Sequence, residues 1–210
     1  MTKENTETVL SLLDTVYGTE KDGFLHHEHW QLLFAILLSA QSTDKQVDEA
    51  LPGLFEAFPT LDSMAEAPLP DIEAKIRSIG LYRSKAKHMK NCSQALLTHF
   101  DGKVPKTLKE LISLPGIGRK TANLFLADAF QIPGITVDTH VKRISNRLGW
   151  ADSDDAYKVE LALQKVLPVD HWIRINIQLI RHGRAICKSK RPKCSECMLA
   201  PYCPSAGKQP

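Results

Sequence analysis

The chain has 210 residues, of which 43% are hydrophobic and 24% are charged, and its formal net charge is +3. This composition is typical of a globular protein with one large core or two modest lobes, and it excludes a long disordered chain. The N-terminus does not resemble a secretory signal, and the longest apolar stretch, Trp30 to Leu38, is too short to span a bilayer. We therefore expect a soluble intracellular protein.

Helical periodicity dominates the chain, and no stretch alternates convincingly with the two-residue period of a strand. An amphipathic stripe begins near Val9, an apolar helix is expected from His29 to Ala40, and Thr43 should cap a helix that ends before Pro59. Pro-Gly pairs are expected to break the chain as turns at 52–53, 115–116 and 133–134. Further helical patterns lie near 71–78, 83–99, 106–113, 119–130, 139–149, 155–166 and 171–185. The predicted fold class is all-α.

The charges are unevenly distributed along the chain. Residues 43–75 include eight acidic and two basic side chains, whereas residues 181–210 include seven basic side chains and one acidic side chain, Glu196. A basic end suits a polyanionic partner. A solvated tail would explain the same charges, so the charge pattern alone does not decide between the two.

Four of the five cysteines fall within seventeen residues near the C-terminus. An intracellular chain rarely needs disulfides, so a tight group of thiols indicates a metal site, whereas the isolated Cys92 is expected to be buried. Metal binding would also order this segment, whose short loops bury little apolar surface. Thiolates alone permit zinc or an iron–sulfur cluster, and the four candidate ligands are Cys187, Cys194, Cys197 and Cys203.

A second informative stretch is Leu114-Pro-Gly-Ile-Gly118, which lies between two helical patterns. Pro115 fits the second position of a tight turn and Gly116 the third, where a positive φ is needed. Gly118 allows a close backbone approach where the next helix begins. The N–H groups at that helix start carry a partial positive charge, so phosphate is the natural ligand, although a plain connection between helices is the simpler alternative.

Two polar residues follow the hairpin. Lys120 is expected in the first turn of its helix, where a cation opposes the helix dipole and is a poor choice for helix stability alone. Asp138 precedes another helical pattern, and an Asp in that place is a common N-cap. The residues by themselves favour a solvated lysine and a structural cap, although a lysine nucleophile and a carboxylate facing a cationic sugar would also use these residue types.

Together the hairpin with Lys120, the segment Val137-Asp-Thr-His140 and the Cys-x6-Cys-x2-Cys-x5-Cys spacing resemble bacterial endonuclease III. That family is the iron–sulfur branch of the helix–hairpin–helix DNA glycosylases. The resemblance also covers Leu37-Leu-Ser-Ala-Gln-Ser-Thr-Asp44 and Ile79-Gly-Leu-Tyr82, so it runs through most of the chain. Related adenine glycosylases usually carry a catalytic glutamate in the early helix, and Ile36-Leu-Leu-Ser39 contains none.

The resemblance implies a bifunctional glycosylase and lyase that removes oxidised pyrimidines, such as thymine glycol, from double-stranded DNA. Lys120 would be the nucleophile and Asp138 would assist it. A [4Fe–4S] cluster would be bound by the four cysteines, and we expect a monomer in the bacterial cytoplasm, associated with the nucleoid through DNA. The residues expected to contact DNA are Gln41 and Leu81 in the base stack, the hairpin residues Leu114, Gly116, Ile117 and Gly118, and His140, Lys190, Arg191 and Lys193.

The resemblance further implies two helical lobes flanking a cleft. Residues 22–132 would form a six-helix lobe with the hairpin, and residues 1–21 with 133–210 would form a second lobe with the cluster loop. Lys120 and Asp138 should then face each other across the cleft. The alternatives are a glycosylase with another lesion preference, an enzyme that acts mainly as an abasic-site lyase, and a non-catalytic DNA-binding module with a zinc site.

Overall fold

A computed structural model describes residues 2–19 and 28–208 of the chain. These residues form helices and contain no strand, which confirms the all-α fold class. None of the described helices is long and apolar enough to cross a membrane. The chain divides into two compact units, Gly23–Gln131 and Met1–Asp22 with Ile132–Pro210. The lobe boundary expected between residues 21 and 22 lies outside the described residues.

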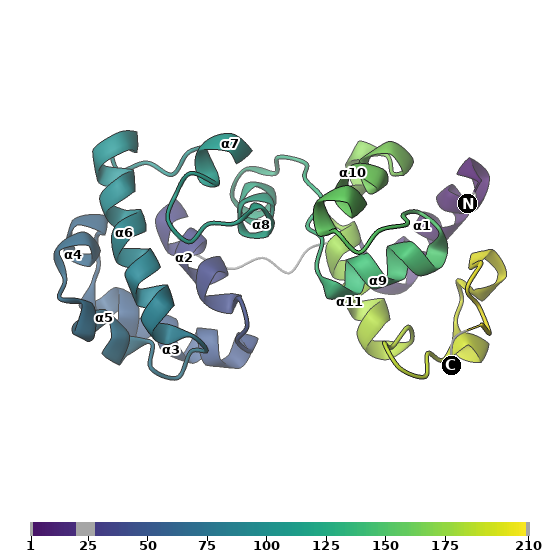
Figure 1. Cartoon of the computed structure of the whole chain (residues 1–210), viewed down its shortest axis with the longest axis horizontal. Helices are drawn as coiled ribbons and strands as arrows, with labels where there is room; N and C mark the ends of the chain where they lie inside the picture. Colours follow the sequence, from purple (N-terminus) through teal and green to yellow (C-terminus); the bar gives the residue numbers. More distant parts are fainter. Residues whose placement is uncertain (1, 20–27, 209–210) are drawn as a thin grey trace. The chain divides into compact units, whose positions relative to one another are not determined.

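The unit Gly23–Gln131 is built around the apolar helix α2 and the long helix α6 (Figure 1). Helix α2 packs against α3, α6 and α8, and α6 also packs against α4 and α5. The side chains of Trp30 and of residues 32–38 are buried, which explains why this helix is apolar on all sides. The helices are α2 His29–Ser39, α3 Asp44–Ala57, α4 Leu61–Glu66, α5 Leu69–Lys75, α6 Tyr82–Phe100, α7 Leu108–Leu111 and α8 Arg119–Phe130.

Two expectations for this unit were wrong. The Pro-Gly pair at 52–53 does not form a turn but lies inside α3. A capping box between Thr43 and Gln46 starts that helix, and the buried Val47, Leu51 and Leu54 stabilise it through tertiary packing that outweighs the proline penalty. The structure also adds α4 to the six expected helices; this short helix has its own capping box and was too short to show a clear period.

The second unit contains the N-terminal helix and the C-terminal third of the chain. Its core is formed by apolar side chains such as Leu13, Ile144 and Leu179 from three different helices. The helix expected over 171–185 begins only at Ile175, because a 3-10 turn precedes it. The elements are α1 Lys3–Tyr17, α9 Thr139–Leu148, α10 Ala156–Val166, η1 Val169–His171, α11 Ile175–Ala185, η2 Cys194–Glu196 and η3 Ala200–Tyr202.

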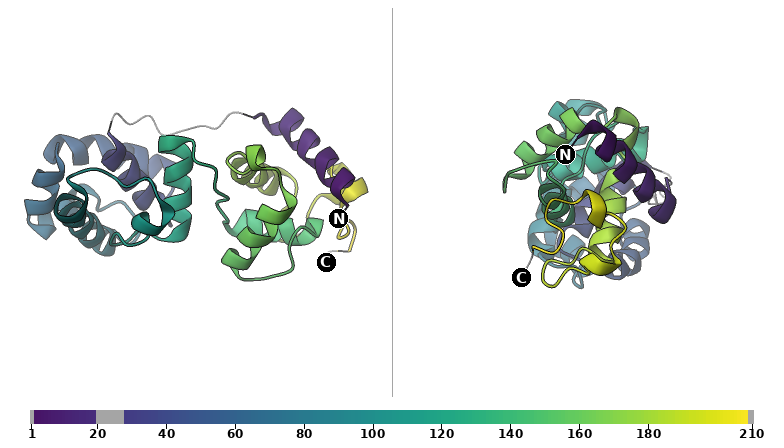
Figure 2. Two further views of the ribbon diagram at one scale, coloured as in Figure 1. Left: turned by 90° about the horizontal axis from the view of Figure 1, so that it is seen from above. Right: turned by 90° about the vertical axis from the view of Figure 1, so that its right-hand side faces the viewer.

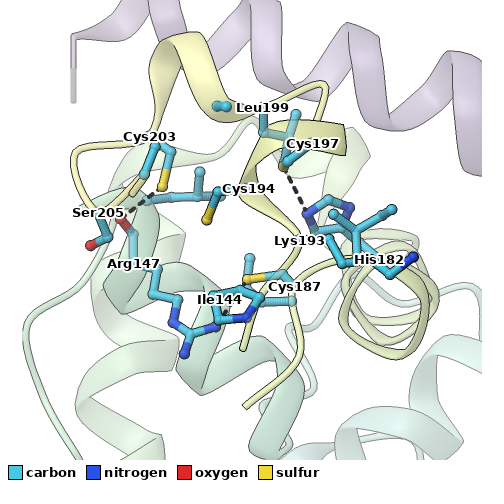
Figure 3. A pocket seen from close by; sticks show the side chains of 15 residues that line it. Ile144, Arg147, His182, Cys187, Lys193, Cys194, Cys197, Leu199, Cys203 and Ser205 are labelled. Carbon is cyan, nitrogen blue, oxygen red and sulfur yellow. Dashed lines mark hydrogen bonds between the residues drawn. The ribbon is translucent and has the colours of Figure 1, made fainter. Parts of the chain in front are cut away.

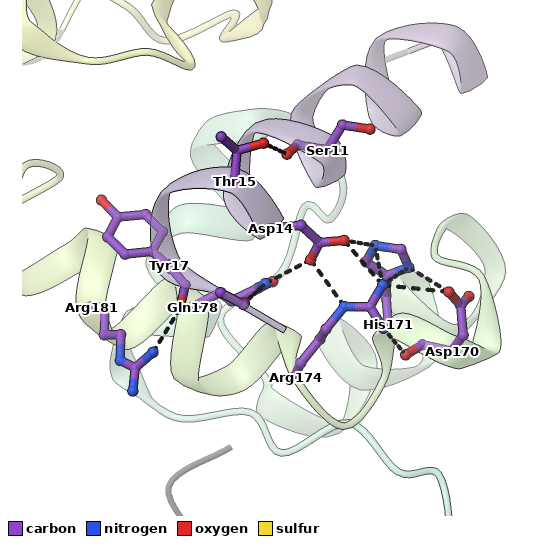
Figure 4. A network of polar contacts seen from close by, with 10 residues as sticks. Ser11, Asp14, Thr15, Tyr17, Asp170, His171, Arg174, Gln178 and Arg181 are labelled. Carbon is purple, nitrogen blue, oxygen red and sulfur yellow. Dashed lines mark hydrogen bonds and ion pairs between the residues drawn. The ribbon is translucent and has the colours of Figure 1, made fainter. Parts of the chain in front are cut away.

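A network of polar side chains joins α1 to α11 (Figure 4). The Asp14 carboxylate accepts hydrogen bonds from Arg174 Nε at 3.0 Å, Arg174 Nη2 at 3.1 Å and Gln178 Nε2 at 2.8 Å. His171 Nε2 lies 3.3 Å from the same carboxylate. Burial raises the pKa of Asp14, but these hydrogen bonds and the charge of Arg174 outweigh burial and lower it. The N-terminal helix is therefore held in its unit by polar contacts as well as by its apolar stripe.

The start of α1 lies beside the C-terminal segment in this unit. Thr2 and Asn5, at the start of α1, line one groove together with residues 201–204 near the C-terminus. Figure 2 shows the start of α1 beside the C-terminal segment. The cysteine-rich segment is thus covered on one side by the first helix of the chain.

Candidate functional site

The hairpin between α7 and α8 is a tight turn fixed by one backbone hydrogen bond. Ile117 N–H donates to the Leu114 carbonyl at 3.1 Å, and Gly116 has a φ of +80°. Leu114 and Ile117 are buried, whereas Gly116 and Gly118 are exposed. Apolar side chains therefore anchor the two sides of the hairpin, and its glycine backbone faces outward.

Helix α8 begins at the hairpin without a side-chain cap. Gly118 is the N-cap, and a Cβ added there would meet no protein atom within 4 Å. The N–H groups in the first turn of a helix lack acceptors within that helix and carry its positive dipole end. An exposed, unobstructed helix start of this kind can take an anion close to the backbone.

Lys120 and Asp138 lie where the sequence placed them, each in a separate unit. Lys120 is exposed in the first turn of α8. Asp138 is the N-cap of α9, where its Oδ1 accepts a hydrogen bond from Val141 N–H at 2.8 Å. The expected approach of Lys120 to Asp138 across the two units stays a prediction.

His140 lies in the first turn of α9 and packs against Gly183 of α11. A Cβ at position 183 would lie 2.3 Å from His140 Nδ1, so only glycine fits there. Arg143 Nη2 lies 3.1 Å from the same nitrogen, and because guanidinium only donates, Nδ1 is the acceptor and the ring proton resides on Nε2. Burial and the charges of Arg143 and Arg184 lower the pKa of His140, against an opposing effect of Asp138. His140 is thus suited to donate a hydrogen bond rather than to add a positive charge.

Gln41 and Leu81 lie in neighbouring turns of one unit. Both have left-handed backbones, with φ values of +55° and +57°. The two turns are in contact, because a Cβ at Gly80 would lie 2.6 Å from the Gln41 carbonyl oxygen. Leu81 is 61% exposed, which excludes a role in the core. An exposed leucine and an exposed glutamine are thus presented together.

The four clustered cysteines line one cavity (Figure 3). Their sulfur atoms point toward its centre, and apolar side chains such as Leu199 and Ile144 form part of the wall. Burial, together with the charges of neighbouring thiolates, raises the pKa of both Cys197 and Cys203 against backbone hydrogen bonds that lower it. In the part of the chain that the structure describes, no three His, Cys, Asp or Glu side chains lie close enough together to hold a single metal ion.

Two nitrogen-bearing side chains face these sulfur atoms. Arg147 Nη1 donates to Cys187 Sγ at 3.2 Å, and His182 Nε2 lies 3.6 Å from Cys197 Sγ. The other imidazole nitrogen of His182 is 3.0 Å from the Tyr17 hydroxyl. Burial and the charge of Arg143 lower the pKa of His182 to about 4, so its ring is neutral at pH 7.

The loop between the first two clustered cysteines carries the expected basic residues. Lys190 and Arg191 are exposed, whereas Lys193 is paired with Glu196 at 3.0 Å. Arg147 donates to the carbonyls of residues 188 and 189 at 2.7 and 2.9 Å, and Arg143 donates to that of residue 187 at 2.8 Å. Sequence reasoning missed both arginines; their spacing of four residues on α9 was the available signal, since it places them on one helix face.

Comparisons with known proteins agree with this geometry. Residues 34–169 match the model of the HhH-GPD superfamily base excision DNA repair protein. The chain is 42% identical over 205 residues to endonuclease III of Synechocystis, covering 97% of this chain and 94% of that protein. It is 40% identical to endonuclease III of Bacillus subtilis over 182 residues, covering 85% and 82% of the two chains.

Solved structures give the same result. The chain is similar to a trapped covalent intermediate of endonuclease III with DNA, with a TM-score of 0.91 and 38% identity, covering 99% of this chain and 98% of that one. The chain therefore belongs to the HhH-GPD superfamily of base excision DNA repair proteins, within the endonuclease III family of DNA glycosylases with abasic-site lyase activity.

Proposed function

We propose that this chain is a bifunctional glycosylase and lyase that removes oxidised pyrimidines of the thymine glycol type from double-stranded DNA, acting as a monomer. The observation that carries the proposal is the exposed Lys120 directly after an outward-facing glycine hairpin, in a chain of the endonuclease III family. The hairpin would hold a phosphate, and the lysine would then lie beside the same strand.

Lys120 would supply the nucleophile. Its neutral ε-amine attacks C1′ of the damaged nucleotide and forms a carbon–nitrogen bond as the glycosidic bond breaks, and the base leaves with the electron pair of that bond. Loss of the amine proton and opening of the sugar ring give a Schiff base between Nζ and C1′. Removal of a C2′ proton then expels the 3′ phosphate, which nicks the strand 3′ to the lesion.

Asp138 would act on the same sugar. Its Oδ1 accepts the capping hydrogen bond from Val141, and a carboxylate has further lone pairs that can accept a proton or face a cation. We propose that it assists deprotonation of the Lys120 amine or stabilises the cationic sugar as the base departs. This role requires the two units to bring Asp138 to Lys120 on DNA.

The four clustered cysteines fit a [4Fe–4S] cluster. They line one cavity, and their sulfur atoms point toward its centre. Nitrogen donors next to the sulfurs, as Arg147 provides, are common around iron–sulfur clusters. Held by Cys187, Cys194, Cys197 and Cys203, the cluster would order the basic loop.

The exposed groups around these centres would bind the duplex. Lys190 and Arg191 are placed on the ordered loop to meet phosphates, and Lys193 could join them by leaving Glu196. Gln41 and Leu81 would enter the base stack when the damaged base is extruded, because an exposed leucine on a turn is a suitable wedge and the amide can pair with the orphaned base.

Borohydride trapping on a duplex with one thymine glycol tests the catalytic proposal. The expected result is a covalent complex with the intact protein, none with Lys120→Ala, and an undiminished yield with Lys165→Ala, which removes an exposed lysine from α10. Base loss without trapping or nicking would instead indicate a monofunctional glycosylase. Binding without any reaction, even at an abasic site, would favour a non-catalytic DNA-binding module.

Metal analysis tests the cofactor proposal separately. The purified protein should be brown and contain about four iron atoms and four sulfides per chain. One zinc per chain and no visible absorption would contradict it.

A further inference from the structure

Lys85 is a buried lysine in the first turns of α6. Only 5% of this residue is exposed. Its Nζ donates hydrogen bonds to the carbonyl oxygens of Leu38 at 2.9 Å and Ala40 at 2.5 Å, and to Ser42 Oγ at 3.0 Å. An ammonium has three donors, so this geometry satisfies all of them. The three acceptors belong to the end of α2 and to the turn that carries Gln41.

The lysine supplies a charge that α2 itself lacks. The last turn of α2 contains no basic residue, and its carbonyl groups carry the negative end of the helix dipole. Lys85 places a cation there from another helix. The chain is thereby held in an extended conformation at Ala40 before it turns into the left-handed conformation of Gln41.

The same residue also holds the second turn. Lys85 N–H donates to the Leu81 carbonyl at 3.1 Å, which closes the first turn of α6 onto a residue with a left-handed backbone. A left-handed conformation costs a non-glycine residue about 1–2 kcal/mol, so it persists only where surrounding contacts fix it. Lys85 is therefore bonded to both turns, through its side chain to one and through its main chain to the other.

The buried lysine has a desolvation cost as well as these stabilising contacts. Burial lowers the pKa of Lys85, and its acceptors are two carbonyls and a hydroxyl rather than a carboxylate. An ammonium buried without a counter-ion is costly, and an apolar side chain usually fits a core at lower cost. The ammonium lies where the Gln41 turn follows α2, beside the Gly80–Leu81 turn.

We propose that Lys85 is a positioning residue that holds the Gln41 and Leu81 turns in the geometry that enters DNA. This inference rests on the proposed function, in which Gln41 and Leu81 fill the gap left by the extruded base. Lys85 touches neither the sugar nor the base. It acts by keeping two protruding side chains at a fixed spacing, so that the enzyme does not have to order them when it meets a lesion.

Lys90 offers a matched control on the same helix. Its Nζ donates to the Ala67 carbonyl at 2.6 Å, at the C-terminal cap of α4. Lys90→Met therefore removes a lysine-to-carbonyl cap of similar kind without touching the Gln41 or Leu81 turn. Lys85→Met removes the charge and all three donors while keeping most of the side-chain volume.

The experiment compares two abasic substrates. The first is a duplex with 2-aminopurine opposite the abasic site, whose fluorescence reports insertion into the stack; the second is the single strand, which has no partner strand to wedge. Lys85→Met should reduce single-turnover nicking of the duplex by roughly 10- to 100-fold and suppress the fluorescence change. Trapping on the single strand should stay within about threefold of the unmodified protein, and Lys90→Met should leave both measurements unchanged.

Further variants keep the outcomes separable. Gly80→Ala places a Cβ 2.6 Å from the Gln41 carbonyl and should reproduce the duplex-specific loss even if Lys85→Met folds poorly. The inference would be overturned if Lys85→Met and Gly80→Ala each lost as much activity on the single strand as on the duplex. It would also be overturned if neither variant lost activity on either substrate. If Gln41→Ala and Leu81→Ala also leave duplex nicking and the fluorescence change unaltered, then the proposed wedge function of Gln41 and Leu81 is wrong. If these two variants reduce duplex nicking and the fluorescence change, then only the proposed role of Lys85 is wrong.

Discussion

Gly116 lies against the side chain of His88, so closely that a Cβ at position 116 would stand 2.6 Å from His88 Cβ and Cγ. His88 belongs to α6, and Gly116 is the third residue of the hairpin turn, with a φ of +80°. The close contact with His88 and the positive φ are therefore two independent reasons why position 116 requires glycine. The hairpin is seated on α6, the helix whose first turn also carries the Leu81 and Lys85 contacts.

Gly116→Ala should destabilise the protein. The left-handed backbone would cost about 1–2 kcal/mol and the contact with His88 would add to it, so the apparent Tm should fall by about 5 °C or more. Gly53→Ala is the matched control: Gly53 lies inside α3 with no atom within 4 Å of an added Cβ, and alanine there should stabilise by about 0.5–1 kcal/mol. Thermal melts of the two variants test both the expected destabilisation by Gly116→Ala and the expected stabilisation by Gly53→Ala.

Gly118→Ala should separate binding from stability. An added Cβ meets no protein atom within 4 Å, and Gly118 has an ordinary negative φ of −86°, so the Tm should barely change. A phosphate approaching the start of α8 would meet that Cβ, and duplex affinity should fall by roughly tenfold. Unchanged affinity in a filter-binding or anisotropy titration would mean that the DNA backbone does not approach Gly118.

Substitutions of Asp138 should distinguish its cap from its chemistry. Asparagine is as good an N-cap as aspartate, so Asp138→Asn should keep the hydrogen bond to Val141 and lower stability by less than about 0.5 kcal/mol. Asp138→Ala should cost about 1 kcal/mol. Both should slow single-turnover base release by about 100-fold or more if the carboxylate acts on the reaction. If Asp138→Asn were fully active, the only role of Asp138 would be to cap α9.

The sequence-based expectations held best where local rules decide the structure. Helix α8 spans the expected 119–130 because a Pro-Gly turn precedes it and another Pro-Gly pair follows it. Asp138 caps α9 as expected, because the cap depends only on residues three positions apart. The local pattern failed at Pro52, where burial of one face of α3 outweighs the preference of proline for turns.

Contacts between distant segments were beyond local rules. The hydrogen bond from Lys85 to the Leu38 carbonyl joins residues 47 positions apart, and that from Arg143 to the Cys187 carbonyl joins residues 44 apart. In the sequence these side chains are ordinary members of amphipathic helices. Even the exposed position of Leu81 requires the left-handed turn, which a Gly-Leu pair suggests without fixing.

The basic loop should contribute to DNA binding through charge alone. Lys190→Ala should lower the slope of log K against log salt by about 0.9, the value for one lost phosphate contact, equally for damaged and undamaged duplexes. Lys193→Ala should have a smaller effect, because that ammonium is paired with Glu196. Lys165→Ala on α10 serves as the control. Titrations at several salt concentrations measure the slope, and an unchanged slope for Lys190→Ala would place this side chain away from the DNA.

The Asp14 network should make the second unit sensitive to acid. Because the folded-state pKa of Asp14 is lowered, its carboxylate stabilises the fold fully above the unfolded pKa, near 4. This contribution is lost as the pH falls through the lowered folded value. Asp14→Asn removes the charge that Arg174 and Gln178 bind, so it should cost about 1–3 kcal/mol at pH 7, and the difference from the unmodified protein should shrink below pH 4.

Asp154→Asn provides the control for this pH dependence. Asp154 is fully exposed and lies 3.8 Å from Lys142, so screening by water should keep its effect small at every pH. Thermal melts of the three proteins between pH 3.5 and pH 7 measure the differences. A gap between Asp14→Asn and the unmodified protein that stays constant down to pH 3.5 would show that packing of the side chain, rather than its charge, joins α1 to α11.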